Sequence, residues 1–206
     1  MKFKLVKLFF YILHWIGFFY VMEFALSKVN YMRLLRSLNF CLKKGKGRSF
    51  FELNIMPKND VNGKLVLLVG SMRYNFHYSF YYLRNKVIVV DKDLNAKKYI
   101  GRAEFIHDDV RNIKSYIDDK SISLVQFNGI YGWGINSISA LNQAISSVYE
   151  VMNSNSTLLF GFNPKSHDKE RLLEKIHYVF HSFEEIQKSD MYFVLEDQIY
   201  FNAKKI

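Results

Sequence analysis

The chain has 206 residues, of which half are apolar and 17% aromatic, so it can bury the core of one domain of ordinary size. Cys41 is the only cysteine, which excludes an intramolecular disulfide and a thiolate zinc site and fits a reducing compartment such as the cytoplasm. The net charge of +10 favours an anionic partner, either a membrane surface, a nucleic acid or a phosphorylated small molecule.

Most of the basic excess lies in the first 50 residues, where Glu23 is the only acid. The uncharged stretch 8–22 has 15 residues, whereas a membrane-spanning helix needs about 20. The stretch that follows places Met32, Leu35 and Leu38 at helical spacing among basic side chains, a pattern typical of a helix that lies on an anionic surface.

Residues 1–48 are therefore expected to form an apolar and basic helical segment, separate from a domain at 49–206, with a flexible hinge at "KKGKGR". Two interpretations of the segment stay open. Residues 5–44 contact the inner face of the cell membrane peripherally, or these helices pack on the downstream domain or on a second copy of the chain. The sequence does not indicate whether the protein is a monomer or an oligomer.

From residue 64 onward, short β-rich runs alternate with helical patterns. The expected strands are 64–70, 86–91, 103–109, 121–128 and 156–163, with a closing hairpin at 191–205, and the expected helices or helical turns are 76–84, 94–101, 113–119, 137–153 and 169–180. This alternation predicts an α/β fold that is Rossmann-like. We expect a mostly parallel seven-stranded sheet with helices on both faces, a C-terminal antiparallel hairpin and an N-terminal helical appendage.

Ligands of such sheets bind beyond the carboxyl ends of the strands. Gly70, Asp91, Asp109 and Asn128 each come at the end of an expected strand. An acid after the second strand suits a ribose diol, because a carboxylate accepts hydrogen bonds from both hydroxyls. Both acids also suit the cap of a following helical turn, and that alternative stays open for each.

The order of elements over residues 64–206 resembles class I S-adenosylmethionine-dependent methyltransferases. The resemblance rests on "VLLVGS", "VIVVDKD", "AEFIHDDVRNI" and the stretch from "SLVQFNGIYGWG" to "LLFGFN", which is similar to a subset found in bacterial surface-polysaccharide gene sets. It implies S-adenosylmethionine as the cofactor, with Gly70 at the glycine loop, Asp91 at the ribose, Asp109 near the adenine and Asn128 facing cofactor or acceptor.

The chain departs from the family pattern at three places. The first loop keeps one glycine, Gly70, followed by the bulky "SMRYNFHY"; Ser123 stands where the family often has an Asp; and "NSNST" replaces Pro-Gly-Gly. This degenerate glycine loop leaves open a non-catalytic scaffold or assembly partner that keeps only the fold.

The remaining candidate residues concern the methyl acceptor. His77 and Asn128 are the catalytic candidates, His77 as a general base, although its aromatic neighbours also suit a buried structural histidine. Tyr131 and Trp133, between the glycines of "NGIYGWGIN", are expected to line an acceptor pocket, or alternatively belong to the core. We predict no metal site, since no histidine has ligand spacing to acidic or cysteine partners.

The sequence thus predicts a methyltransferase-like protein that acts on a sugar or lipid-linked saccharide. A nucleic-acid methyltransferase is the weaker alternative, because the basic residues are concentrated in the apolar N-terminal segment rather than across the strand ends.

Overall fold

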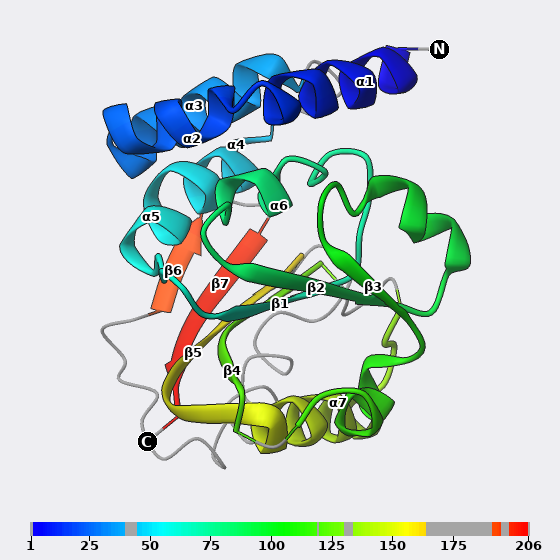
Figure 1. Cartoon of the computed structure of the whole chain (residues 1–206). Coiled ribbons are helices and arrows are strands. Elements are labelled where there is room, and N and C mark those ends of the chain that lie inside the picture. Colours follow the sequence, from blue (N-terminus) through cyan, green and yellow to red (C-terminus); the bar gives the residue numbers. More distant parts are fainter. Residues whose placement is uncertain are drawn as a thin grey trace.

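The computed structural model describes residues 2–39, 45–118, 120–129, 134–163, 191–194 and 198–205. A seven-stranded sheet lies at its centre, in the order β3-β2-β1-β4-β5-β7-β6 (Figure 1). The strands are β1 (Leu65–Val69), β2 (Lys86–Asp91), β3 (Glu104–His107), β4 (Ile122–Asn128), β5 (Met152–Phe162), β6 (Met191–Val194) and β7 (Gln198–Lys204). Strands β1 to β5 pair in parallel, and β7 pairs antiparallel with both β5 and β6. The predicted Rossmann-like sheet with a C-terminal antiparallel pair is confirmed.

The central strands are apolar on both sides because helices cover both faces of the sheet. In β1, Leu67 and Val69 belong to one buried cluster, whereas Val66 and Leu68 belong to another. Successive side chains of a strand point to opposite faces, so an uninterrupted apolar run supplies two cores at once. Figure 1 shows the two helical layers on either side of the sheet.

One face is covered by α7 (Ile138–Val151), which lies at the bottom of Figure 1, and by the 3₁₀ helix η3 (Val110–Ser115). Ser137 caps α7 by accepting a hydrogen bond from the Ala140 N–H at 3.1 Å. One side of the helix is buried, and its residues recur at the spacing of an amphipathic helix that packs on a sheet. They are Leu141, Ala144, Ile145, Val148 and Val151. The predicted helix over 137–153 is confirmed.

The opposite face is covered by the N-terminal helices α1 (Lys2–Trp15), α2 (Phe18–Ala25) and α3 (Lys28–Leu38). Beneath them lie α4 (Lys46–Phe50), the π-helix η1 (Phe51–Ile55), α5 (Met56–Lys58) and α6 (Tyr78–Tyr81). Phe10 and Phe19 pack against Phe76 and Phe80 in the same buried cluster as the strands. The inner side of the N-terminal segment therefore packs on the α/β domain, one of the two interpretations that its sequence allows.

Two hydrogen bonds fix this N-terminal layer to the backbone of the domain. The buried Tyr31 hydroxyl donates to the Phe80 carbonyl at 2.8 Å, and the Tyr11 hydroxyl donates to the Gly101 carbonyl at 2.6 Å. The segment expected to be a flexible hinge is helical from Lys46 onward, within α4. That expectation is wrong for residues 46–48, while residues 43 and 44 lie outside the described chain.

In the described part of the chain, no single helix has the length and hydropathy to cross a membrane. Taken together, α1 and α2 meet that criterion, but they are bent by 76° where they join.

The connections on the β3 side of the sheet are short, and the helix expected over 76–84 is shorter than predicted. Only Tyr78–Tyr81 of the expected helix 76–84 is α-helical, and the turns after β2 and β3 are the 3₁₀ helices η2 (Leu94–Tyr99) and η3. Twelve residues separate β2 from β3, which is near the minimum for a parallel crossover with a full helix. The expected helix at 169–180 lies outside the described residues.

Candidate functional site

A cleft opens at the carboxyl ends of β1, β2 and β3, where the parallel strands finish at one edge of the sheet. Counted with its open mouth and the solvent in it, the cleft has a volume of about 370 Å³. Its lining consists of Val69, Gly70, Val90, Asp91, Lys92, Asp108, Asp109, Val110, Gly134 and Ile135. Three of the predicted cofactor residues, Gly70, Asp91 and Asp109, are therefore brought together.

Gly70 and Asp91 form the β1–β2 wall of this cleft. Gly70 has a φ of 81°, a left-handed conformation that glycine adopts without steric cost, so β1 can turn sharply as it ends. The next N–H, of Ser71, donates to Asp91 Oδ2 at 3.0 Å, and the Asp93 N–H donates to Asp91 Oδ1 at 2.8 Å. Two backbone donors thus hold the Asp91 carboxylate at the strand edge, and each oxygen retains a lone pair for a further donor.

Asp109 faces the cleft but is already engaged within its own turn. Its carboxylate accepts from the Arg111 N–H at 3.0 Å and pairs with the Arg111 guanidinium at 2.9 and 2.8 Å. This guanidinium is the main cause that holds the pKa of Asp109 below its ordinary value. The capping role that the sequence also allows is observed, because Asp109 is the N-cap of η3.

Asp108, which also follows the third predicted strand but is not among the predicted cofactor residues, is the second acid at the end of β3 in the cleft. Its carboxylate accepts from the Tyr116 hydroxyl at 2.8 Å, from the Asn112 amide at 2.9 Å and from the Asp109 N–H at 2.6 Å. These hydrogen bonds, that of Tyr116 first, lower the pKa of Asp108. The adjacent pair "DD" at a strand end was the signal that could have identified it.

Lys92 also lines the cleft and was not predicted. Its Nζ donates to the Gly134 carbonyl at 3.0 Å, and the Lys92 carbonyl contacts His107 Nε2 at 3.2 Å. The side chain therefore joins the end of β2 to the segment that follows β4. It also places a cation beside the carboxylates of Asp91 and Asp109 in the cleft lining.

Asn128 stands at the carboxyl end of β4, as expected, with its Oδ1 buried and accepting no hydrogen bond from the described residues. Gly161 on β5 makes room for it. A Cβ at position 161 would lie 2.8 Å from Asn128 Oδ1 and 2.6 Å from the Tyr200 ring. Gly129, with a φ of 70°, donates to the Gly161 carbonyl at 2.8 Å. Because none of the described residues donates to this oxygen, it can accept a hydrogen bond from a ligand.

His77 is placed away from the cleft lining. It is fully buried, its Nδ1 lies 3.1 Å from the Asn39 amide nitrogen, and its Nε2 lies 3.5 Å from Glu52 Oε1. Burial, followed by the charges of Arg48 and Arg36, lowers the pKa of His77 to about 3. The geometry therefore corresponds to the structural histidine that the sequence also allows, and the described contacts give it no route to an acceptor in the cleft.

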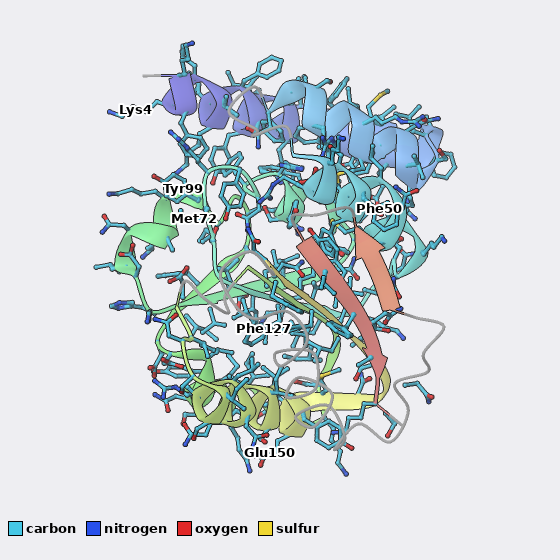
Figure 2. All side chains as sticks on the ribbon, turned by 180° about the vertical axis from the view of Figure 1, so that it is seen from behind. Lys4, Phe50, Met72, Tyr99, Phe127 and Glu150 are labelled. Carbon is cyan, nitrogen blue, oxygen red and sulfur yellow. The ribbon has the colours of Figure 1, made fainter. Side chains whose placement is uncertain are left out.

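The other predicted features are only partly visible. Tyr131 and Trp133 lie outside the described residues. In the bulky loop after Gly70, the Met72 side chain is 52% exposed, and Arg48 stacks on the Tyr74 ring at 3.8 Å. Figure 2 shows Met72 beside Tyr99 under the N-terminal helices. Among the described residues, no cluster of His, Cys, Asp and Glu could hold a metal ion.

No protein-family model and no curated protein matches the sequence. Solved structures do match the fold. The PH0226 protein from Pyrococcus horikoshii OT3 has a TM-score of 0.62 at 16% identity, covering 80% of this chain and 93% of its own. A SAM-dependent methyltransferase from Archaeoglobus fulgidus has a TM-score of 0.56 at 14% identity, covering 78% and 95%. A putative rRNA-methylase from Clostridium thermocellum has a TM-score of 0.52 at 16% identity, covering 80% and 97%. The chain therefore has the fold of S-adenosylmethionine-dependent methyltransferases.

Proposed function

We propose that the protein is a methyltransferase that uses S-adenosylmethionine. The observation that carries the proposal is the pairing of Gly70 and Asp91 at adjacent strand ends, in the cleft of a sheet with the methyltransferase strand order. Ligands of open α/β sheets bind at this edge. The bulky loop after Gly70 supports the proposal as well. Its Met72 side chain is exposed, and none of its bulky residues is among the described residues that line the cleft, so the loop does not fill the cleft.

The residues present fit the cofactor. Asp91 would accept from the ribose hydroxyls with its free lone pairs, and the turn at Gly70 would let the backbone approach the methionine portion. Asn128 would accept from an ammonium or hydroxyl donor with its Oδ1, to which no described residue donates. When bound, the cofactor supplies an electrophilic sulfonium methyl group. The protein's part is to orient the acceptor and to exclude water from the cleft.

We further propose that the acceptor is a sugar or lipid-linked saccharide, methylated in the cytoplasm at the inner face of the cell membrane. Tyr131 and Trp133 carry this part of the proposal, because aromatic faces stack on sugar rings. A nucleic-acid acceptor ranks lower, although one structural neighbour is named an rRNA-methylase. Among the described residues that line the cleft, Lys92 is the one with a basic side chain, and it lies beside three carboxylates that would repel phosphates.

One observation favours a second function, that of a non-catalytic scaffold. The Arg111 guanidinium engages both oxygens of Asp109, the residue that the family resemblance places near the adenine. A cofactor would have to bind while Asp109 stays paired with Arg111, or it would have to displace Arg111 from Asp109. The existing ion pair therefore competes with a cofactor for this carboxylate.

Titration calorimetry with S-adenosylmethionine and with its demethylated product, S-adenosylhomocysteine, tests the cofactor. We expect binding by the wild type and a loss of about tenfold or more in Asp91→Asn, because a carboxylate that bonds a ligand hydroxyl contributes about 1.5–3 kcal/mol. Asp93→Asn is the matched control, since Asp93 lies two residues on, is exposed and caps η2. The affinity of Asp93→Asn for the cofactor is expected to stay within about twofold of wild type, because the Asp93 side chain bonds Asn95 and the substitution keeps the Asp93 N–H that donates to Asp91. Absence of binding by the wild type would leave the scaffold function.

The acceptor is tested separately by following methyl transfer from labelled cofactor. A saccharide-lipid fraction and total RNA are offered in parallel. Label in the saccharide supports the proposed acceptor, whereas label in RNA alone overturns it without affecting the cofactor assignment.

A further inference from the structure

The outer side of α1 and α2 carries large apolar side chains that nothing in the described chain covers. In α1 they are Leu5, Leu8, Phe9, Ile12 and Trp15, and Ile16 continues the series; in α2 they are Tyr20, Val21 and Phe24. Trp15 is 87% exposed and Phe24 85% exposed. Within each helix these residues recur at helical spacing, on the side that leaves Phe10 and Phe19 buried, and together they are called here the outer apolar face. A face of this kind marks an interaction site rather than scattered exposure.

The inner sides of the same helices are already in use. Val6 and Phe10 of α1 and Phe19 of α2 are completely buried against the domain, so both helices carry apolar side chains on their inner and outer sides. Large apolar side chains on the outer side of helices that already pack on the domain indicate a second contact. The second partner must therefore approach from outside, opposite the layer that contains α7 (Figures 1 and 2).

The charges around this face select an anionic partner. Lys2 and Lys4 are exposed at the start of α1, and Figure 2 shows Lys4 at the outer edge of the helical layer. The only acid in α1 to α3 is Glu23, which is buried and paired with Lys28 at 2.8 Å and with Arg84 at 3.2 Å. No exposed carboxylate of these helices would therefore repel anionic headgroups, while exposed lysines are attracted to them.

We propose that the outer apolar face docks on an anionic lipid bilayer, with α1 and α2 lying in the interface rather than crossing it. Spanning would require Phe10 and Phe19 to leave the protein core, and the two helices are bent by 76°. Trp15 and Tyr20 combine an apolar ring with a polar atom, which suits the headgroup level. This inference does not depend on the proposed chemistry of the cleft.

The docking face is connected to the cleft through two short contacts. Phe3 of α1 packs on the Tyr99 ring with centroids 5.0 Å apart, and the Tyr99 carbonyl accepts from Ser71 Oγ at 3.0 Å. The N–H of the same Ser71 holds the Asp91 carboxylate. A docked protein would thus hold the wall of its cleft at a fixed height above the bilayer.

Vesicle flotation of the full chain tests the proposal. The vesicles are phosphatidylcholine alone or phosphatidylcholine mixed with phosphatidylglycerol. We expect flotation with the anionic vesicles and weaker flotation with the neutral ones. The double variant W15E/F24E should lower the partition coefficient by about tenfold or more, because interfacial binding scales with the apolar area inserted. K2Q/K4Q should lower it on anionic vesicles only.

Leu94→Glu is the matched control, because Leu94 is a 57% exposed leucine on η2, outside the outer apolar face. It should float like the wild type, and a thermal melt of each variant checks that the fold is kept. Equal flotation of W15E/F24E and wild type would overturn the proposal. A wild type that fails to float but forms a dimer, which W15E/F24E converts to monomer, would also overturn it in favour of an interface between copies.

Discussion

The two faces of the sheet are covered in different ways. On the α7 face the core is made of aliphatic residues and phenylalanines, and α7 follows β4 directly in sequence. On the other face the cover comes from the distant N-terminal helices, and the core there contains tyrosines and a buried ionic cluster. That cluster consists of Glu52, Arg36, Arg48, His77, Tyr78 and Asn39, and is called here the Glu52 cluster.

This difference has a physical origin. Apolar contact is non-directional, so the α7 face needs only the right volume. A buried carboxylate must be paired and hydrogen-bonded, which requires Arg36 from α3, Arg48 from α4 and Tyr78 from α6 to arrive in one arrangement. The Glu52 cluster therefore fixes how the N-terminal layer sits on the domain, a specificity that the apolar residues of the same face do not provide alone.

The largest effect is expected from Glu52→Ala. The substitution leaves two guanidinium groups in a desolvated site without their counter-charge, so the free energy of unfolding should fall by about 3–5 kcal/mol in urea titration. Glu104→Ala is the control, because Glu104 forms an exposed pair with Lys86 at 3.2 Å, and its cost is expected to be about 0.5 kcal/mol or less. A similar loss of unfolding free energy in both variants would mean that the buried Glu52 cluster stabilises its face of the sheet no more than an exposed ion pair does.

The next effect is the pH dependence that His77 contributes. Its pKa is about 3 in the folded protein, so the folded state keeps the ring neutral where the unfolded chain, with an ordinary histidine pKa of about 6.5, takes up a proton. Stability is therefore lost as the pH falls from about 6.5 towards 3, at up to about 1.4 kcal/mol per pH unit from this residue.

The pH effect is measured as the difference in unfolding free energy between wild type and His77→Gln across that window. The variant should lack this part of the acid sensitivity, so the difference narrows with falling pH. Between pH 7 and 8 both states hold the ring neutral, and the difference should be constant. A difference that is constant throughout would show that His77 is not buried.

The smallest effects are expected from removing one helix N-cap on each face of the sheet. Ser137 accepts the Ala140 N–H at 3.1 Å at the start of α7, and Ser27 accepts the Asn30 N–H at 3.4 Å at the start of α3. Ser137→Ala should cost about 1 kcal/mol, and Ser27→Ala less, about 0.5 kcal/mol, since the longer bond is weaker. Thermal melts of both variants give the comparison. A larger loss of stability in Ser27→Ala than in Ser137→Ala would mean that the stronger N-cap lies on the N-terminal face.

The sequence predicts the sheet and α7 well because each depends on local pattern. The runs "KLVLLVG" and "KVIVVD" are apolar at consecutive positions, as strands covered on both faces must be. The short helices of the other face were less predictable. There, residues 76–84 are shaped by contacts with Phe10 and Phe19, about sixty residues earlier in the chain, and no local pattern carries that information.

The candidate site shows the same division. Gly70, Asp91 and Asp109 follow from strand-end position, and the cleft brings them together. Lys92 was missed because its role depends on reaching Gly134, a contact that spans 42 positions. His77 illustrates the opposite case, since the type of residue suggested a base while burial beside Asn39 and Glu52 gave it a structural place.

Gly161 has a consequence for how this chain can vary. Its missing side chain accommodates the Tyr200 ring on one side and the Asn128 oxygen on the other, so one position links the last strand pair to the end of β4. Homologous chains should therefore covary at positions 128, 161 and 200. A suppressor selection started from Gly161→Ala should return smaller residues at position 200 rather than changes elsewhere in the sheet.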